Sequence, residues 1–357
     1  MKRIKIGKRY IGEGEPPYFI ADIAANHDGD LDRALKLIEL AKNSGADAAK
    51  FQNFQADKIV SKRGFESLGT QLSHQKSWGK SVYEVYKEAS LSFEWTEKLK
   101  NKCDEVKIEY FTSPYDFESV DHVDPYINVY KIGSGDITWS EIIEYIARKG
   151  KPVMLATGAS TMSDVVRAMN VLQSTTDDIV LMQCNTNYTA NTENFKYINL
   201  NVLKTYKRRF PDVILGLSDH TCGHATILGA IALGASVFEK HFTDDNLRSG
   251  PDHKFAMNPN MWREMMGRAN ELYQALGDGI KRIEENEKET SILQRRAIRV
   301  TRNMQKGNVL QKADLVPVRP IPIDGLPPYE IGLVIGRKLT RDVKADDYIQ
   351  LGDIETC

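Results

Sequence analysis

Short apolar runs recur along the first 241 residues of the chain, and amphipathic segments separate them. Most of these runs are continuously apolar rather than alternating, which is typical of strands in a parallel sheet that helices cover. After the first run, Leu31, Leu35 and Ile38 have the spacing of one helix face. The pattern predicts eight strands, at residues 18–24, 47–52, 108–112, 127–132, 152–157, 179–185, 213–218 and 236–241.

Eight strands that alternate with helices are typical of a (β/α)8 barrel, or TIM barrel. An open doubly wound sheet is the alternative, but no GxGxxG motif follows the first predicted strand. We therefore predict a barrel over residues 1–276. The segment 56–90, between the second and third strands, is too long for a simple connection, and we expect a lid or edge insertion above the barrel mouth.

The pattern changes after the last predicted barrel helix. Residues 281–289 are almost all charged or polar, so we predict a solvated linker or exposed helix over residues 277–295. From about Arg296 onward, short strands and turns with several prolines predict a small, mostly β domain over residues 296–357. A domain of roughly 60 residues has a marginal core, and we expect it to lean on the barrel or on another subunit.

The charge balance narrows the choice of partners. The chain of 357 residues has 48 Lys plus Arg and 49 Asp plus Glu, a net charge of −1, which gives no broad electrostatic case for nucleic acid or an anionic membrane. No apolar run approaches the roughly 20 residues of a membrane span, and the first ten residues lack a signal-peptide core. We expect a cytoplasmic protein that acts on small molecules.

Polar side chains cluster where the predicted strands end. In a parallel barrel the active site lies at the carboxyl ends of the strands. The groups at these ends are Asp22, Asn26, His27, Lys50, Gln52, Thr112, Ser113, Lys131, Ser134, Asp136, Thr157, Gln183, Asn185, Asn187, Tyr188, Ser218, Asp219, His220, Glu239 and His241. Their recurrence at all eight strands predicts a polar ring around a cavity.

Two histidines in this ring indicate a metal site. His220 and His241 lie at the ends of the seventh and eighth strands, and neighbouring strands are about 4.8 Å apart, so both imidazoles can reach one ion. Two imidazoles with positions open to oxygen suit Mn²⁺, Fe²⁺, Co²⁺ or Mg²⁺ better than a closed zinc site. The alternative is that each is a hydrogen-bonded barrel residue. His224 and His253 are further candidate ligands.

Two lysines indicate an anion site. Lys50 and Lys131 lie within or at the end of predicted strands, where an unpaired ammonium would be costly, so each needs an anionic partner. Gly133, Ser134 and Gly135 can add backbone N–H groups and a hydroxyl. A bound phosphate or carboxylate would satisfy both lysines, and a buried pair with Glu239 is the alternative.

Nine short motifs carry a family resemblance. They are ADIAANH at residues 21–27, KFQ at 50–52, TSP at 112–114, YKIGSG at 130–135, ATG at 156–158, QCNTNY at 183–188, GLSDHT at 216–221, EKHFT at 239–243 and GPDH at 250–253. With them the chain resembles the sialic acid synthase family, phosphoenolpyruvate-dependent synthases of nonulosonic acids, along nearly its whole length. The last domain is similar to that family's antifreeze-like (SAF) module, with matches at 306–307, 314–315, 319–320 and 335–337.

The resemblance implies that C3 of phosphoenolpyruvate (PEP) attacks the aldehyde of an open-chain N-acylated hexosamine, after which water adds at C2 and phosphate leaves. The acceptor would be N-acetylmannosamine or a 2,4-diacetamido-2,4,6-trideoxyhexose. A divalent ion on His220 and His241, with Mn²⁺ preferred over Mg²⁺ or Co²⁺, would polarise the aldehyde oxygen. The implied PEP-binding residues are Lys50, Ser113, Lys131, Ser134, Thr186 and Ser218.

The resemblance also implies an acceptor side. Gln52, Tyr188 and Asp252 would contact the sugar, and Arg319 would reach its acyl group from a neighbouring subunit in a domain-swapped homodimer. Asp22 and Asp136 would act as acid and base, although the family usually has Glu at both positions, and Ala156 replaces a phosphate-binding Ser. The Asp22 carboxylate ends about 1.5 Å short of a Glu carboxylate, which requires a different sugar pose or an intervening water. Both shortened carboxylates together favour a bulkier acceptor, and neutral drift with compensating waters is the alternative.

Two other functions fit parts of the pattern. A related PEP-dependent 3-deoxy-ulosonate synthase acting on another aldose would explain the lysines and the metal, but such enzymes normally lack the SAF module. A non-catalytic sugar-binding relative would explain the two shortened carboxylates. Assays with phosphorylated and unphosphorylated acceptors test the first alternative. Metal binding without turnover would favour the second.

Overall fold

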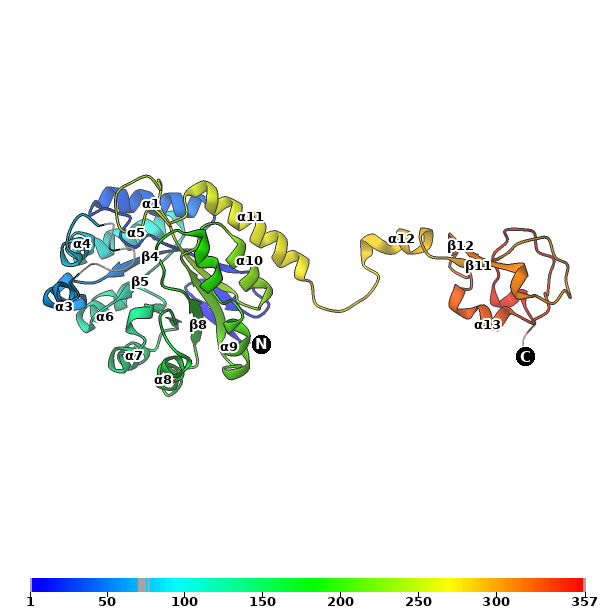
Figure 1. Cartoon of the computed structure of the whole chain (residues 1–357), viewed down its shortest axis with the longest axis horizontal. Helices are drawn as coiled ribbons and strands as arrows, with labels where there is room; N and C mark the ends of the chain where they lie inside the picture. Colours follow the sequence, from blue (N-terminus) through cyan, green and yellow to red (C-terminus); the bar gives the residue numbers. More distant parts are fainter. Residues whose placement is uncertain (1, 70–74, 76–77, 356–357) are drawn as a thin grey trace. The chain divides into compact units, whose positions relative to one another are not determined.

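The computed structural model describes residues 2–69, 75 and 78–355. The chain divides into two compact units, Met1–Gly277 and Asp278–Cys357 (Figure 1). No helix among the described residues has both the length and the apolar composition to cross a membrane.

The first unit is a barrel of eight parallel strands, which confirms the predicted fold. The strands are β3 (Tyr18–Asp22), β4 (Ala48–Asn53), β5 (Glu109–Pro114), β6 (Tyr130–Ile132), β7 (Val153–Ala156), β8 (Ile179–Cys184), β9 (Ile214–Asp219) and β10 (Val237–His241). They are hydrogen-bonded in the order β5-β4-β3-β10-β9-β8-β7-β6, and β5 also contacts β6. Each strand overlaps the run that predicted it. Six of them, β3 and β6 to β10, are buried along their whole length, which explains their continuous apolar pattern.

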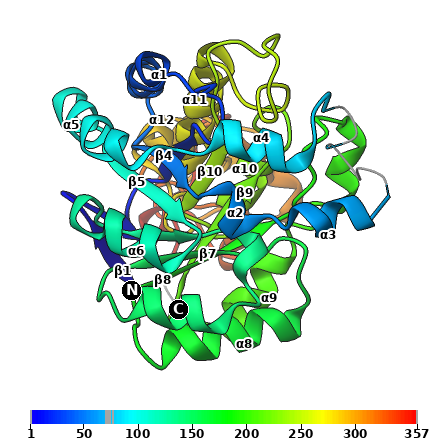
Figure 2. The same ribbon diagram turned by 90° about the vertical axis from the view of Figure 1, so that its left-hand side faces the viewer.

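Helices surround the strands (Figure 2). They are α1 (Leu31–Asn43), α5 (Thr96–Val106), α6 (Phe117–Val123), α7 (Ser140–Ala147), α8 (Met162–Gln173), α9 (Val202–Arg209), α10 (Ala225–Ala232) and α11 (Pro259–Leu276). The side chain of Asp30 caps α1 by accepting from the N–H groups of Asp32 and Arg33. Leu37 and Ile38 are fully buried, so the predicted apolar face of this helix packs on the barrel.

The described part of the predicted insertion after β4 contains three short helices, α2 (Ala56–Ile59), α3 (Lys62–Ser67) and α4 (Val82–Ala89). Several of its apolar side chains pack together in a small cluster of their own. Ile59, Trp78 and Tyr86 also line the main cavity of the barrel. The insertion therefore forms one wall of that cavity.

An antiparallel hairpin, β1 (Arg3–Ile6) and β2 (Arg9–Gly12), precedes the barrel and was not predicted. Its Ile4, Ile6 and Ile11 belong to the barrel core. Gly12 lies against Ile214, the first residue of β9, and Lys2 pairs with Asp178 just before β8. The hairpin thus covers the amino-terminal ends of strands, opposite the end at which the predicted site residues lie.

The second unit has a separate core. A short exposed helix, α12 (Lys288–Leu293), precedes an antiparallel pair, β11 (Ala297–Val300) and β12 (Leu315–Val318), and a further short helix, α13 (Ile331–Val334). Ile298, Val300, Leu310, Leu339 and Ile349 are almost completely buried around this pair. The prediction of short strands and turns from about residue 296 therefore matches the structure of this segment.

Candidate active site

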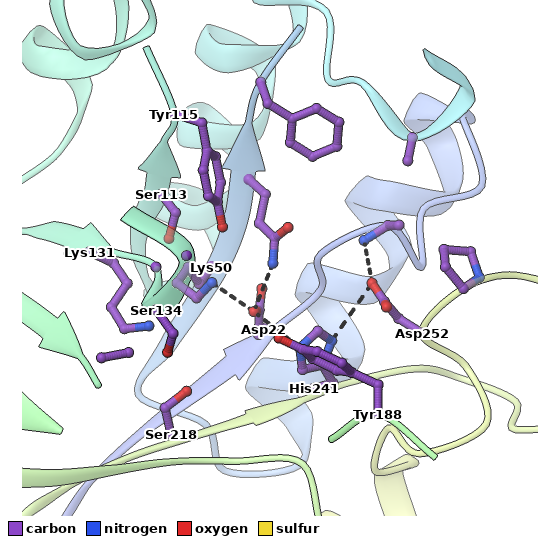
Figure 3. A pocket seen from close by; sticks show the side chains of 18 of the residues that line it. Asp22, Lys50, Ser113, Tyr115, Lys131, Ser134, Tyr188, Ser218, His241 and Asp252 are labelled. Atoms are coloured by element: carbon purple, nitrogen blue, oxygen red, sulfur yellow. Dashed lines mark hydrogen bonds and ion pairs between the residues drawn. The ribbon is translucent and has the colours of Figure 1, made fainter. Parts of the chain in front are cut away.

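A cavity of about 380 Å³ opens at the carboxyl ends of the barrel strands, which is the size of a small-molecule site. Its polar lining residues are Asp22, Lys50, Gln52, Ser113, Tyr115, Lys131, Ser134, Asp136, Cys184, Tyr188, Ser218, His220, Glu239, His241 and Asp252. Figure 3 shows the lysines and serines on one side, Tyr188 and Asp252 on the other, and Asp22 between them. The cavity thus brings together twelve of the twenty residues predicted for the polar ring, and Asp252 joins them. The predicted ring residues that do not line it are Asn26, His27, Thr112, Thr157, Gln183, Asn185, Asn187 and Asp219.

Strand register sets the centre of this arrangement. Asp22 on β3 is the register partner of His241 on β10 and of Lys50 on β4, so these three side chains form one row across three strands. Lys50 Nζ lies 2.7 Å from Asp22 Oδ2, and Gln52 donates to the same oxygen at 3.2 Å. A shift of one residue in either pairing would turn the row away from the cavity.

Glu239 links the two lysines. Its Oε1 lies 3.0 Å from Lys131 Nζ and 3.8 Å from Lys50 Nζ, and it accepts a hydrogen bond from Ser218 Oγ at 3.2 Å. The sequence left open whether a ligand or a protein carboxylate pairs with these lysines. In the structure Lys50 pairs with Asp22 and Lys131 pairs with Glu239. An ammonium group has three donor hydrogens, so both lysines keep capacity for a ligand oxygen.

Burial and charge separate the pKa values of the carboxyl groups. Burial alone would raise the pKa of Glu239, but Lys131 and Lys50 outweigh it and lower the pKa to about 2. Burial raises the pKa of Asp22, although Lys50 opposes the effect. Burial also raises the pKa of Asp136 to about 6, and no opposing charge compensates. The cavity therefore holds one firmly ionised carboxylate and two whose protonation is more easily changed.

The two predicted metal ligands face the same cavity. The ring centres of His220 and His241 are 5.3 Å apart. Burial lowers the pKa of His220 to about 3 and that of His241 to about 4, so both imidazoles are neutral near pH 7, as metal ligands must be. His220 Nδ1 lies 2.8 Å from the carbonyl oxygen of Asn185, a contact that leaves Nε2 as the lone-pair nitrogen.

Other features of the pair also fit a metal ion. His241 Nδ1 is buried without a hydrogen-bond partner in the described chain. Among the described residues, no group of three His, Cys, Asp or Glu side chains is arranged to hold an ion. An ion held by these two nitrogen atoms would therefore take its other ligands from oxygen atoms of water or substrate.

The lysine side of the cavity carries hydroxyl groups. Ser113 Oγ is buried without a hydrogen-bond partner among the described residues, so it is free to contact a ligand. Ser134 Oγ accepts from the N–H of Gly158 at 2.9 Å. A Cβ atom at Gly158 would come within 2.4 Å of the methyl group of Thr186. Thr186 therefore lies beside Ser134 and Cys184, which line the cavity, although it is not itself a lining residue, and its role in binding PEP stays a prediction.

The other side carries the predicted acceptor residues. The ring of Tyr188 lies 4.3 Å from that of His220, centre to centre. Asp252 Oδ2 accepts from the N–H of Ala25 at 3.3 Å and lies 3.8 Å from His241 Nδ1. Arg319 belongs to the second unit, where it is exposed.

Glu239 was predicted as a member of the polar ring. It lies two positions before His241 on β10, and the alternation of side chains places both on the cavity face. Several other lining residues were not predicted. Phe54, Trp78, Tyr86 and Tyr115 form an aromatic wall, with Phe54 5.4 Å from Tyr86 and 6.0 Å from Tyr115 between ring centres. No motif in the insertion indicated this wall.

Comparison with known proteins agrees with this geometry. The NeuB family matches residues 37–281 and the SAF domain family residues 295–355. An uncharacterised protein of Methanocaldococcus jannaschii is 34% identical over 99% of both chains. The N,N'-diacetyllegionaminic acid synthase of Campylobacter jejuni is 32% identical over 93% of this chain and 98% of that protein. The crystal structure of N-acetylneuraminic acid synthetase from Leptospira borgpetersenii has a TM-score of 0.70 and 25% identity, over 81% of this chain and 95% of that one. These matches confirm the resemblance found in the sequence: the chain belongs to the NeuB family and contains a SAF domain.

Proposed function

We propose that the protein is a PEP-dependent nonulosonic acid synthase, which condenses PEP with an unphosphorylated N-acylated hexosamine and releases phosphate. The observation that carries the proposal is the division of one cavity into a side with two buried lysines and a side with two neutral imidazoles. Its relatives support it, because they include synthases of legionaminic, pseudaminic and N-acetylneuraminate-9-phosphate products.

The lysine side suits PEP. Lys50 and Lys131 supply positive charge for the phosphate and carboxylate, and Ser113, Ser134 and Ser218 supply hydroxyl donors. In the reaction C3 of PEP forms a bond to C1 of the acceptor aldehyde, water adds at C2, and the C2–O bond to phosphate breaks. Glu239 holds both ammonium groups in place while the ligand binds.

A divalent ion fits the histidine side. His220 and His241 would hold it, with Mn²⁺ proposed first and Mg²⁺ or Co²⁺ as alternatives. When bound, the ion supplies Lewis-acid polarisation of the acceptor aldehyde. Asp252 and Tyr188 would orient the sugar hydroxyl groups beside it, and Asp22 and Asp136 would hold or move protons at the oxygen atoms of the reacting carbons.

The walls of the cavity favour one class of acceptor. Among the described lining residues, Lys50 and Lys131 are the only lysine or arginine side chains, and both contact carboxylates, so little cationic capacity remains for a second phosphate group. The aromatic wall favours methyl and acetamido groups over hydroxyl groups. We therefore propose a 2,4-diacetamido-2,4,6-trideoxyhexose rather than N-acetylmannosamine or a sugar phosphate.

Phosphate release from PEP tests this function. With Mn²⁺ present, we expect release with the diacetamido-trideoxyhexose, about 10-fold or more lower kcat/KM with N-acetylmannosamine, and none with arabinose 5-phosphate. Product mass should equal the sum of acceptor and PEP plus water minus phosphate. Release only with arabinose 5-phosphate would indicate a 3-deoxy-ulosonate synthase. Tight metal binding without release for any acceptor would favour the non-catalytic sugar-binding alternative.

Arg319 provides a test of subunit exchange. We propose a homodimer in which this residue completes the acceptor site of the partner. Arg319→Ala and His241→Ala chains, each nearly inactive at low acceptor concentration, should then complement each other when unfolded, mixed equally and refolded together. Random pairing puts half of the chains in mixed dimers with one complete site each, so about one quarter of wild-type activity is expected. An absence of complementation, with dimers present by light scattering, would contradict the exchange.

A further inference from the structure

The loop between β10 and α11 brings Asp252 to the cavity. Only two contacts of its carboxylate are seen in the described chain, the hydrogen bond from the N–H of Ala25 and the 3.8 Å approach to His241. Both are long. The position of Asp252 therefore depends on how firmly the loop itself is held.

The next residue, His253, is completely buried and does not line the cavity. Its ring lies between two loops. Nδ1 is 2.7 Å from Thr243 Oγ1 at the start of its own loop, and Nε2 is 2.8 Å from Asp28 Oδ1 on the loop that follows β3. The carbonyl oxygen of His253 accepts from Asn246 Nδ2 at 2.9 Å. Every polar atom of its ring thus serves to fix the loop.

Asp28 is the centre of this connection. Besides His253, the Asp28 carboxylate binds Arg248, which lies on the same β10–α11 loop as His253, at 2.8 Å. It also binds Arg33 of α1, at 3.2 Å. Arg33 in turn makes two hydrogen bonds to Asp244. Three cationic or donor side chains therefore converge on one carboxylate, and they join the β3–α1 loop to both ends of the loop that carries Asp252.

Gly250 gives independent support. A Cβ atom at this position would come within 2.6 Å of His253 Cδ2 and 3.1 Å of its Nε2. The loop therefore folds directly over the imidazole, with no room for even one more carbon atom. This close packing leaves the ring a single position, in which it contacts both Thr243 and Asp28.

We propose that His253 is a positioning residue that, through Asp28, holds Asp252 over the cavity and so sets the affinity for the acceptor but not for PEP. The proposal rests on the proposed function in that it assigns Asp252 to the acceptor side. His253 then acts on binding from outside the cavity, and the His253–Asp28 contact is the element that ties the acceptor side to the barrel.

Steady-state kinetics test the proposal. His253→Phe keeps the ring shape and removes both hydrogen bonds, and Asp28→Asn keeps the side-chain shape at a residue whose φ of +54° Asn tolerates well. We expect each variant to raise the acceptor KM about 10-fold or more, with the PEP KM changed less than about twofold. His253→Gln, which can still donate to Asp28, should be affected less. Equal increases in both KM values, or no increase, would overturn the proposal.

A readout without turnover keeps this test separate from that of the proposed function. Trypsin should cut at Arg248 or Lys254 faster in His253→Phe, Asp28→Asn and Gly250→Ala than in wild type, with cleavage elsewhere unchanged. His122→Phe is a matched control, because His122 also contacts a threonine hydroxyl, at 3.0 Å, but lies outside the cavity. Unchanged cleavage of this loop would overturn the positioning role even if wild type proved inactive. An inactive wild type with faster cleavage in the variants would contradict only the proposed function.

Discussion

His241→Ala and His220→Ala should each abolish metal-dependent turnover, with a loss of kcat of about 1,000-fold or more. The reason is that the chain presents two imidazoles to the cavity, and among the described residues no cluster of three ligand side chains can replace them. A single remaining imidazole would bind Mn²⁺ weakly. Polarisation of the aldehyde, which is worth several kcal/mol in the transition state, would be lost with the ion.

The barrel itself should survive both substitutions. Each imidazole borders an existing cavity rather than the apolar core, so truncation enlarges the cavity and leaves the packing of the strands intact. Titration calorimetry with Mn²⁺ measures metal binding, phosphate release measures turnover, and thermal melting measures the stability of the fold. His224→Ala is the control, because His224 lies at the start of α10 and does not line the cavity. Retention of most of the activity by either site variant would show that the metal assignment is wrong.

Lys240→Met should lower the free energy of unfolding by about 3–5 kcal/mol. Lys240 on β10 and Asp219 on β9 are register partners and nearly completely buried. They form an ion pair that the hydroxyls of Thr221 and Thr226 also reach, at 2.8 and 2.7 Å from the same aspartate oxygen. Removing the lysine leaves a buried carboxylate without its counter-charge, which destabilises the fold far more than the loss of a surface ion pair does.

A second variant distinguishes the effect of an unpaired buried charge on stability from the effect of altered packing. Asp219→Asn combined with Lys240→Met removes both charges and keeps similar volumes, so the double variant should recover part of the lost stability. Urea denaturation at pH 7.5 gives the free energies of unfolding of the wild type, of Lys240→Met, of Asp219→Asn and of the double variant. Lys102→Met is the control, since Lys102 forms surface pairs with Glu39 and Glu105, and it should change stability by less than about 1 kcal/mol. A double variant no more stable than Lys240→Met would rule out charge burial as the cause.

The two predictions concern opposite faces of the same strand ends. Ser218, His220, Glu239 and His241 point into the cavity, whereas Asp219 and Lys240 between them point away and pair with each other. Side-chain alternation along a strand makes this division readable from sequence once the strands are located. The alternation identifies Glu239 as a cavity residue as clearly as His241.

Local patterns in the sequence were sufficient for the barrel, its eight strands, the apolar face of α1, the separate small β unit and most of the polar ring. These features depend on periodicity and on polar residues at strand ends, both of which are properties of short segments. Only the tertiary structure decided which polar groups contact each other, such as Glu239 between the two lysines and His253 against Asp28. Such contacts join residues that lie far apart in the chain, and they depend on register, loop path and packing density, which no short segment encodes by itself.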